Sequence, residues 1–175
     1  NLYYQLTASA EKAPLTPDRQ GLFNFGSTVE GHVLAMLREA GYTITAYQQD
    51  VEVEVRGGKI TGHMDGWIHG PDIPAPGCPI EIKGYAFAAD KITDWHQFLE
   101  QPQPWLQQVP VQMQLYLYGS NAPWGLLMLF DKKGAGLYPI RVELDLEFVE
   151  GILRRVESVY AYVRGEMTGQ LDERP

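Results

Sequence analysis

The sequence predicts a mixed α/β or α+β fold in which helices flank one sheet. Three observations support it. Apolar residues recur at helical spacing near each end of the chain, alternating or continuous apolar segments lie between these ends, and clusters of glycine and proline separate the segments. The predicted order is a helix, three strands, one unresolved element, two strands and a helix, which makes a sandwich around one sheet.

The chain has 175 residues, a length typical of one domain. We expect residues 1–25 to be an irregular lead-in, punctuated by Pro14 and Pro17. The first five residues, 1–5, resemble a protease-cleavage tag and therefore predict nothing about the fold. Residues 26–175 are then expected to form a single domain.

The first helix is expected to begin at Ser27. Ser27 can cap it, Glu30 lies at its third position, and Gly41 would end it. Its apolar face consists of Val29, Val33, Met36 and Leu37. Because Ser27 and Glu30 also fit a capping box, capping alone is an alternative explanation of Glu30.

A β-hairpin is expected next. Residues 51–55 alternate between valine and glutamate, Gly57-Gly58 supplies a two-residue turn, and a second strand is expected from about Lys59 to His69. Since side chains alternate along a strand, one face of this second strand holds Thr61, His63, Asp65, Trp67 and His69.

A third strand is expected from Ile80 to Tyr85, after a loop rich in proline and glycine (71–79). Glu81 and Lys83 share one face of it because they are two residues apart. The next segment, 86–109, shows no strong periodicity, as is usual for functional or mobile insertions. Its two tryptophans could stack on nucleobases or merely anchor a long loop, and these are Trp95 and Trp105.

The last third of the chain contains one ambiguous element. Residues 111–118 alternate at period two like a strand, yet Pro110 and Gly119 would equally open and close a helix. Residues 124–130 and 137–143 predict two strands. A C-terminal helix is predicted by the apolar face of Phe148, Val149, Ile152, Leu153, Val156, Tyr160 and Val163.

The composition is that of a soluble globular protein, with 45% hydrophobic and 21% charged residues. No segment approaches the run of roughly 18–20 apolar residues that a membrane-spanning helix needs. The single cysteine, Cys78, excludes an internal disulfide and fits a reducing cytoplasm. The net charge of −8 argues against an ordinary nucleic-acid-binding protein, but a metal site lined by carboxylates is itself acidic until its cation binds.

Two carboxylates on neighbouring strands, with a lysine beside one of them, indicate phosphodiester hydrolysis. This reaction needs a hard cation held by oxygen ligands. Asp65 and Glu81 can supply carboxylate oxygens, and the backbone carbonyl of Ile82 can add a third ligand. Lys83 can orient the attacking water or stabilise negative charge in the transition state.

These residues resemble the motifs of the PD-(D/E)xK nuclease superfamily, in particular its RecB-like and phage lambda exonuclease-like branches. Those families place a Gly-x-x-x-Glu helix before the hairpin, and residues 26–30 fit it, so Glu30 inherits a supporting role at the metal. Asp65 and the Glu81-Ile82-Lys83 string follow in the family's order. A helix with Gln-x-x-x-Tyr comes next, which Gln112 and Tyr116 match, and a second register is Gln114 and Tyr118.

The resemblance implies a restriction-endonuclease-like core and a DNA nuclease that uses Mg²⁺ or Mn²⁺. Metal ligands would be Glu30, Asp65, Glu81 and Ile82, and catalytic residues Asp65, Glu81, Lys83 and Gln112. It favours an exonuclease in recombination, repair or phage DNA metabolism. Such an enzyme works in the cytoplasm of a bacterial or phage-infected cell, on DNA, with recombination or helicase partners and no membrane. The oligomeric state stays open.

Two departures and several alternatives accompany this interpretation. No proline directly precedes Asp65, and the cysteines that some RecB-like members use for an iron–sulfur cluster are absent from the sequence.

A Glu-x-Lys string arises by chance in roughly half of chains this long, and Asp65-Gly66 could be a turn. His63 could reach a metal or simply lie on the surface. The rival functions are a structure-specific endonuclease and a nucleic-acid-binding or assembly module without turnover.

Overall fold

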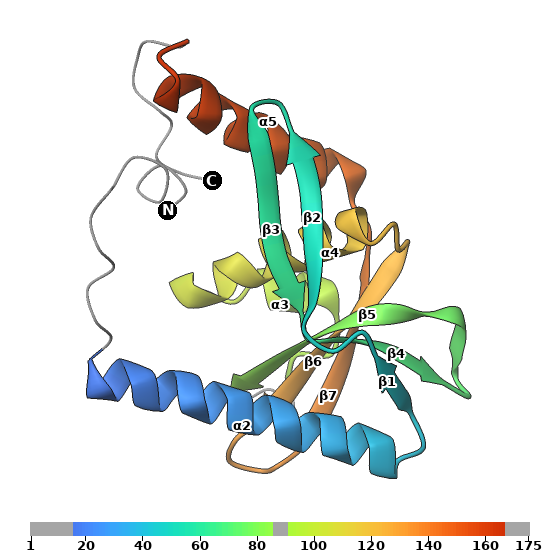
Figure 1. The fold of residues 1–175 in the computed structure, drawn as a ribbon. Coiled ribbons are helices and arrows are strands. Elements are labelled where there is room, and N and C mark those ends of the chain that lie inside the picture. Colours follow the sequence, from blue (N-terminus) through green and yellow to red (C-terminus); the bar gives the residue numbers. More distant parts are fainter. Residues whose placement is uncertain (1–15, 86–90, 167–175) are drawn as a thin grey trace.

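The computed structural model describes residues 16–85 and 91–166, and its elements are arranged around one central sheet (Figure 1). The elements are α2 (Pro17–Glu39), β1 (Thr43–Thr45), β2 (Gln49–Val55), β3 (Gly58–Met64), β4 (Gly66–Gly70), β5 (Ile73–Tyr85), α3 (Trp95–Leu99), η2 (Pro104–Gln107), α4 (Gln108–Gly119), β6 (Trp124–Asp131), β7 (Leu137–Glu143) and α5 (Leu146–Val163). None of the described helices is long and apolar enough to cross a membrane.

The central sheet has five strands in the order β1-β4-β5-β6-β7, and β2 and β3 form a separate two-stranded sheet. Only β5 and β6 run parallel in the central sheet, joined by a crossover that contains α3, η2 and α4. The predicted class, a mixed α/β fold with a central mixed sheet flanked by helices, is therefore confirmed.

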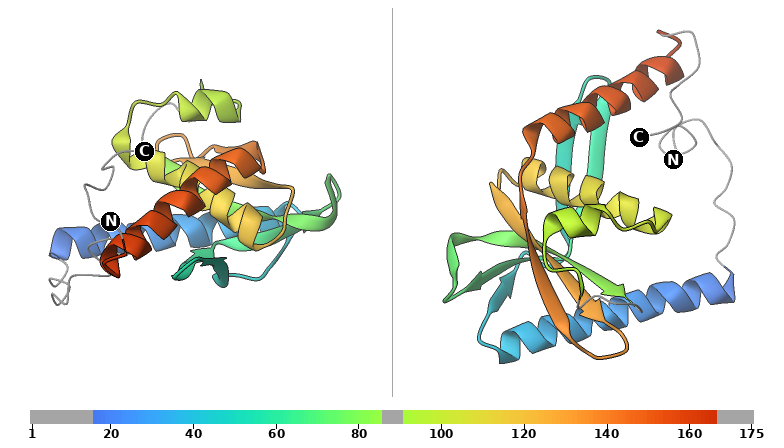
Figure 2. Two further views of the ribbon diagram at one scale, coloured as in Figure 1. Left: turned by 90° about the horizontal axis from the view of Figure 1, so that it is seen from above. Right: turned by 180° about the vertical axis from the view of Figure 1, so that it is seen from behind.

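Helices α2 and α4 cover opposite faces of this sheet (Figures 1 and 2). Val29 and Val33 of α2 belong to one hydrophobic cluster with Ile80 and Ile82 of β5. Tyr85 belongs to the other cluster, which α4 contributes to. Since side chains alternate along β5, Glu81 and Lys83 lie on the α4 face, so the prediction that they share a face is confirmed.

Helix α2 begins ten residues earlier than expected, at Pro17 rather than Ser27. Proline is well suited to a first helical position, and Asp18 complements the positive helix N-terminus. The Gln20 N–H donates to the Thr16 carbonyl oxygen at 2.9 Å, closing the first turn. Residues 17–25 are therefore helical, not irregular.

The predicted second strand is interrupted at Asp65. Its first part, β3, pairs with β2, and its second part, β4, enters the central sheet between β1 and β5. The shared face expected from residue 61 to residue 69 therefore does not exist as one surface. The hairpin turn is also one position earlier than predicted, at Arg56-Gly57, because Val55 pairs with Gly58.

Residues 108–119 form a helix, the alternative that the family resemblance favoured. Pro110 is its third residue, a place where a missing N–H costs nothing because the first four helical N–H groups have no partner within the helix. Residues 86–90 lie outside the described residues, and the predicted irregular segment after them contains the short helices α3 and η2.

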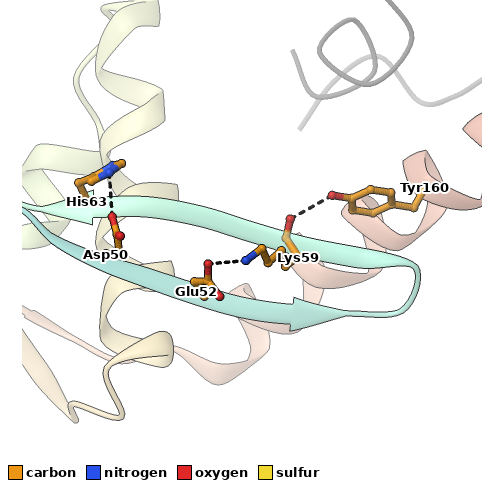
Figure 3. A network of polar contacts seen from close by, with 5 residues as sticks. All are labelled: Asp50, Glu52, Lys59, His63 and Tyr160. Atoms are coloured by element: carbon orange, nitrogen blue, oxygen red, sulfur yellow. Dashed lines mark hydrogen bonds and ion pairs between the residues drawn. The ribbon is translucent and has the colours of Figure 1, made fainter.

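Helix α5 lies across α4 and reaches the tip of the β2–β3 hairpin (Figures 1 and 3). The Tyr160 hydroxyl donates to the Lys59 carbonyl oxygen at 3.0 Å, and the Arg56 N–H donates to Glu157 Oε1 at 3.1 Å. A Cβ atom at Gly58 would lie 2.4 Å from the Tyr160 ring, so a larger residue there would displace this ring. These contacts hold the tip of the hairpin in place.

Candidate active site

Asp65 lies at the junction of the two sheets, between the end of β3 and the start of β4. Its Oδ2 atom accepts a hydrogen bond from the Ile82 N–H at 2.7 Å. The bend that splits the predicted strand thus places the Asp65 carboxylate beside Ile82, near the C-terminal end of β5. This contact brings Asp65 and the Glu81–Lys83 segment together, as the sequence predicted.

Glu81 is a buried carboxylate, 2% exposed, on the α4 face of β5. Lys83 Nζ forms an ion pair with Glu81 Oε1. The other oxygen, Oε2, is buried and has no hydrogen-bond partner among the described residues. A buried polar atom without a partner is costly, and in native proteins it commonly marks the site of an ion or water. Glu81 therefore has an acceptor available for a ligand.

Glu30 lies inside α2, thirteen residues beyond its first residue, so the capping-box explanation of Glu30 is wrong. Its Oε1 atom accepts a hydrogen bond from Gln48 Nε2 at 2.6 Å, and burial followed by the charge of Glu30 raises the pKa of Tyr47. Gln48 and Tyr47 belong to the β1–β2 connection, a segment in which the sequence showed no motif. Only the three-dimensional structure identifies them as neighbours of the site.

Burial and the negative charges of neighbouring acids raise the pKa of Asp65 and of Glu81. Burial, followed by the charge of Glu81, raises the pKa of Asp65 from 3.8 to about 7, although the Ile82 N–H opposes the shift. Burial also raises the pKa of Glu81, while Lys83 lowers it and Glu30 raises it further. Since Glu30 acts on both groups, the three carboxylates form one electrostatic unit that a cation would stabilise.

The site suits a cation that keeps several of its waters. In residues 16–85 and 91–166, no three side chains of His, Cys, Asp or Glu come close enough to hold a metal ion by themselves. Mg²⁺ ordinarily needs only one or two carboxylates, with water completing its octahedron. The N–H and C=O of a strand residue point to the same edge, so the Ile82 carbonyl lies on the Asp65 side of β5. The donor set Asp65, Glu81 and the Ile82 carbonyl therefore fits such an ion.

One of the two candidate glutamines of α4 lines a groove. Gln112 is half-buried and lines a groove of about 140 Å³ between α4 and the hairpin, together with Thr61, Gly62 and Tyr116. None of the three acids lines this groove, but burial, and then the charges of Glu81 and Asp65, raise the pKa of Tyr116. The role of Gln112 at the site stays a prediction.

The alternative register has a structural role. Gln114 is 2% exposed, donates to the Glu143 carbonyl oxygen at 2.8 Å and accepts from the Asp145 N–H at 2.8 Å. These bonds connect α4 to the segment between β7 and α5. Its companion Tyr118 is exposed.

Other candidates lie away from the acids or serve the core. His63 Nε2 lies 2.8 Å from Asp50 Oδ1 on the exposed face of the hairpin (Figure 3), so the surface interpretation of this histidine holds. Cys78 is fully buried, and burial raises its pKa to about 12, which leaves it protonated and unreactive. Trp95 stacks on Phe98 with ring centroids 5.3 Å apart, which supports anchoring rather than substrate gripping. The Trp105 side chain lies outside the described residues.

Comparisons with known proteins agree on the fold. No protein-family model matches the sequence, and no curated protein matches it. The structure resembles the crystal structure of an alkaline exonuclease, LHK-Exo from Laribacter hongkongensis, with a TM-score of 0.60, 18% identity, and coverage of 94% of this chain and 86% of that chain. The complex of LHK-Exo with dAMP gives a TM-score of 0.59, 16% identity and the same coverage.

At this level of identity the likeness establishes the fold. The chain has the fold of an alkaline exonuclease over nearly its whole length. This agrees with the core that the sequence motifs predicted, and the activity is inferred from the site itself.

Proposed function

We propose that this protein is a DNA nuclease that depends on a divalent metal ion. The observation that carries the proposal is the convergence of Asp65, Glu81 and Lys83 at the edge where the hairpin meets β5. They converge on a fold shared with an exonuclease, and within residues 16–85 and 91–166 the ion pairs of the two acids include no cation other than Lys83.

Each group has a role that its position supports. Asp65, Glu81 and the Ile82 carbonyl would hold Mg²⁺ or Mn²⁺, with Glu30 assisting. When bound, the ion would polarise the phosphate and lower the pKa of water. Lys83 is partly exposed and could donate to the attacking water or to the developing negative charge. Gln112, in the groove between α4 and the hairpin, would contact the DNA or help to hold the site.

The neighbouring protein named as an alkaline exonuclease, in one case in complex with dAMP, favours DNA as substrate and digestion from an end. Recombination, repair or phage DNA metabolism, with recombination or helicase partners, is the proposed setting. The second candidate is a DNA-binding or assembly module without turnover. The net charge of −8 suits an assembly role, because such a role does not require attraction to phosphates.

The decisive experiment is degradation of labelled DNA with Mg²⁺, with Mn²⁺ and with a chelator. We expect cleavage only with metal, and a loss of about 10²–10⁴-fold in rate for Lys83→Ala. The matched control is Lys59→Ala, which removes an ion-paired lysine at the tip of the hairpin (Figure 3). Metal-independent cleavage, or equal rates for the two variants, would refute the proposal. DNA binding without cleavage would favour the module.

A further inference from the structure

The turn between β6 and β7 is fixed to the end of the strand that carries Glu81 and Lys83. The Lys132 N–H donates to the Tyr85 carbonyl oxygen at 2.7 Å, which connects the turn to the last residue of β5. The carboxylate of Asp131 accepts hydrogen bonds from two N–H groups within the turn, at 2.8 and 3.1 Å. The backbone of the turn is therefore held in place, and the acid that precedes Lys132 is bound within it.

The Lys132 side chain lies across Gly84, the neighbour of Lys83. A Cβ atom at Gly84 would lie 2.6 Å from Lys132 Cε and 3.1 Å from Val29 Cγ1, so the lysine and α2 fill the space beside this glycine. Lys132 Nζ lies 4.8 Å from the centre of the Phe25 ring, which also belongs to α2. Such a cation–π contact restricts where the ammonium group lies.

The Lys132 ammonium group is available to a ligand. Lys132 is exposed, and the Phe25 ring that it contacts is 49% exposed. No ion pair within residues 16–85 and 91–166 involves Lys132. An ammonium group has three N–H donors, and contact with an aromatic ring provides no acceptor lone pair for them. An anion from outside the protein could therefore bind here, although the net charge of the chain is −8.

Lys132 and Lys83 lie near each other on opposite faces of β5. Because side chains alternate along a strand, the Gly84 position faces α2, as Ile80 and Ile82 do, whereas Lys83 faces α4. Both lysines lie at the carboxyl end of the parallel pair β5 and β6, the edge at which open α/β sheets bind their ligands. The two cations could thus contact different groups of one extended ligand.

We propose that Lys132 binds a backbone phosphate of the DNA strand, next to the phosphate that is cleaved. This inference rests on the proposed function and deepens it, because it assigns a substrate contact outside the candidate metal ligands. Charge complementarity identifies the ligand, since the proposed substrate carries an anionic phosphate at every nucleotide. Lys132 takes no part in the chemical step. Phe25 is a positioning residue, which acts through Lys132.

Lys132→Ala and Lys133→Ala form a matched pair, because each removes one exposed lysine from the same turn. Binding of a labelled DNA duplex is measured by fluorescence anisotropy with a chelator, at several salt concentrations. We expect Lys132→Ala to weaken binding about three- to tenfold and to lower the slope of log Kd against log salt by about one, since one phosphate contact is lost. Lys133→Ala should leave the slope unchanged, and Lys132→Arg should preserve it because the charge remains.

Cleavage with Mg²⁺ gives the second measurement. Lys132→Ala should raise the KM for DNA and leave kcat unchanged, because uniform binding is lost and the chemical step is not affected.

Phe25→Leu tests the positioning role, since it keeps an apolar side chain and removes the aromatic face. We expect DNA binding to weaken by up to about fivefold. Added to Lys132→Ala, Phe25→Leu should cause no further loss, because both changes remove the same contact. The matched control is Phe148→Leu, at another exposed phenylalanine. Full additivity would show that Phe25 acts independently of Lys132.

Three results would overturn the inference. An unchanged KM and salt slope in Lys132→Ala would show that no phosphate is bound there. Equal effects of Lys132→Ala and Lys133→Ala would leave only general attraction. A lower kcat with an unchanged KM would place Lys132 in the chemical step.

The failure of the proposed function gives a different result. A wild-type protein that binds DNA without metal-dependent cleavage, and loses the salt slope in Lys132→Ala, refutes the nuclease and supports the phosphate contact. A wild-type protein that neither binds nor cleaves DNA refutes both.

Discussion

At the scale of single residues, the carboxylates of the candidate site are costly to bury. Asp65 and Glu81 are both taken out of water beside each other, and Lys83 neutralises only one of the two charges. The N–H of Ile82 offsets part of the cost for Asp65. The proposed metal binding would therefore be linked to proton loss, because a divalent ion requires ionised carboxylates.

The raised pKa of Asp65 predicts how stability depends on pH. Burial and the charge of Glu81 raise this pKa from 3.8 to about 7 in the folded protein, so the folded state binds the proton more tightly than the unfolded state does. In the metal-free protein the free energy of unfolding should fall as the pH rises from about 4 to about 7, and then level off with respect to this group.

Asp65→Asn provides the test, because asparagine has the same shape without the charge. Urea unfolding at pH 5 and pH 8 with a chelator should show a smaller drop for Asp65→Asn than for the wild type. Mn²⁺ at pH 8 should restore stability in the wild type alone. Identical pH profiles for the two proteins would contradict the assignment.

At the scale of elements, α4 is a helix with polar residues on two sides. Gln112 and Tyr116 line the groove between α4 and the hairpin, whereas Gln114 is bonded to the segment that follows β7. The two glutamines are two residues apart, so they face different directions on the helix. Their substitution should therefore separate stability from activity.

We expect Gln114→Leu to lower the free energy of unfolding by about 2 kcal/mol, because it leaves the Glu143 carbonyl and the Asp145 N–H without their partner. Gln112→Leu should change this free energy by less than about 1 kcal/mol but reduce DNA cleavage. Denaturant unfolding and a nuclease assay on both variants check the prediction. The reverse pattern would mean that the site uses Gln114.

The elements that could be predicted from sequence are those whose periodicity reflects burial on one side. The apolar run of β6, the alternation of β2 and the apolar stripe of α5 all appear where expected. The helix at 108–119 was ambiguous because buried Gln114 and Tyr116 disturb its apolar pattern. Pro17 and Asp18 are a local signal for the start of α2. Because proline also interrupts helices, the sequence alone predicts an irregular segment there.

The sequence predicts which acids and which lysine belong to the candidate site, and their order along the chain. It does not predict how these side chains are arranged in space. The Asp65-Gly66 dipeptide is a local signal for a break in the strand, but nothing in residues 58–70 indicates that the chain continues in another sheet. The bend depends on pairing with β2 on one side and with β1 and β5 on the other, which are long-range contacts. The hydrogen bond from Gln48 to Glu30 could not be predicted for the same reason, since it joins residues 18 positions apart in the sequence.

At the scale of the whole molecule, the fold and the net charge lead to different expectations about DNA binding. The fold matches an exonuclease over 94% of the chain, yet the net charge is −8. A protein with this charge gains little from general attraction to phosphates. The affinity for DNA in the proposed function should therefore depend on the bound cation and on local contacts in the groove.

An enzyme of this kind should digest DNA from ends. We expect linear duplexes to be degraded progressively with Mg²⁺, and covalently closed circles to persist. Gel analysis of linear, nicked and closed circular forms of one plasmid checks this, with Lys83→Ala as the inactive control. Rapid cleavage of the closed circle, or a preference for branched DNA, would favour the structure-specific endonuclease.

The junction at Asp65 links the hairpin to the central sheet. Strands β2 and β3 extend from this junction to α5 (Figure 1), where the Tyr160 hydroxyl donates to the Lys59 carbonyl oxygen. At the junction, the Asp65 carboxylate accepts a hydrogen bond from the Ile82 N–H. A shift of the tip would therefore be passed to Asp65 through paired strands rather than through a flexible loop, and the bond from Tyr160 to Lys59 restrains such a shift.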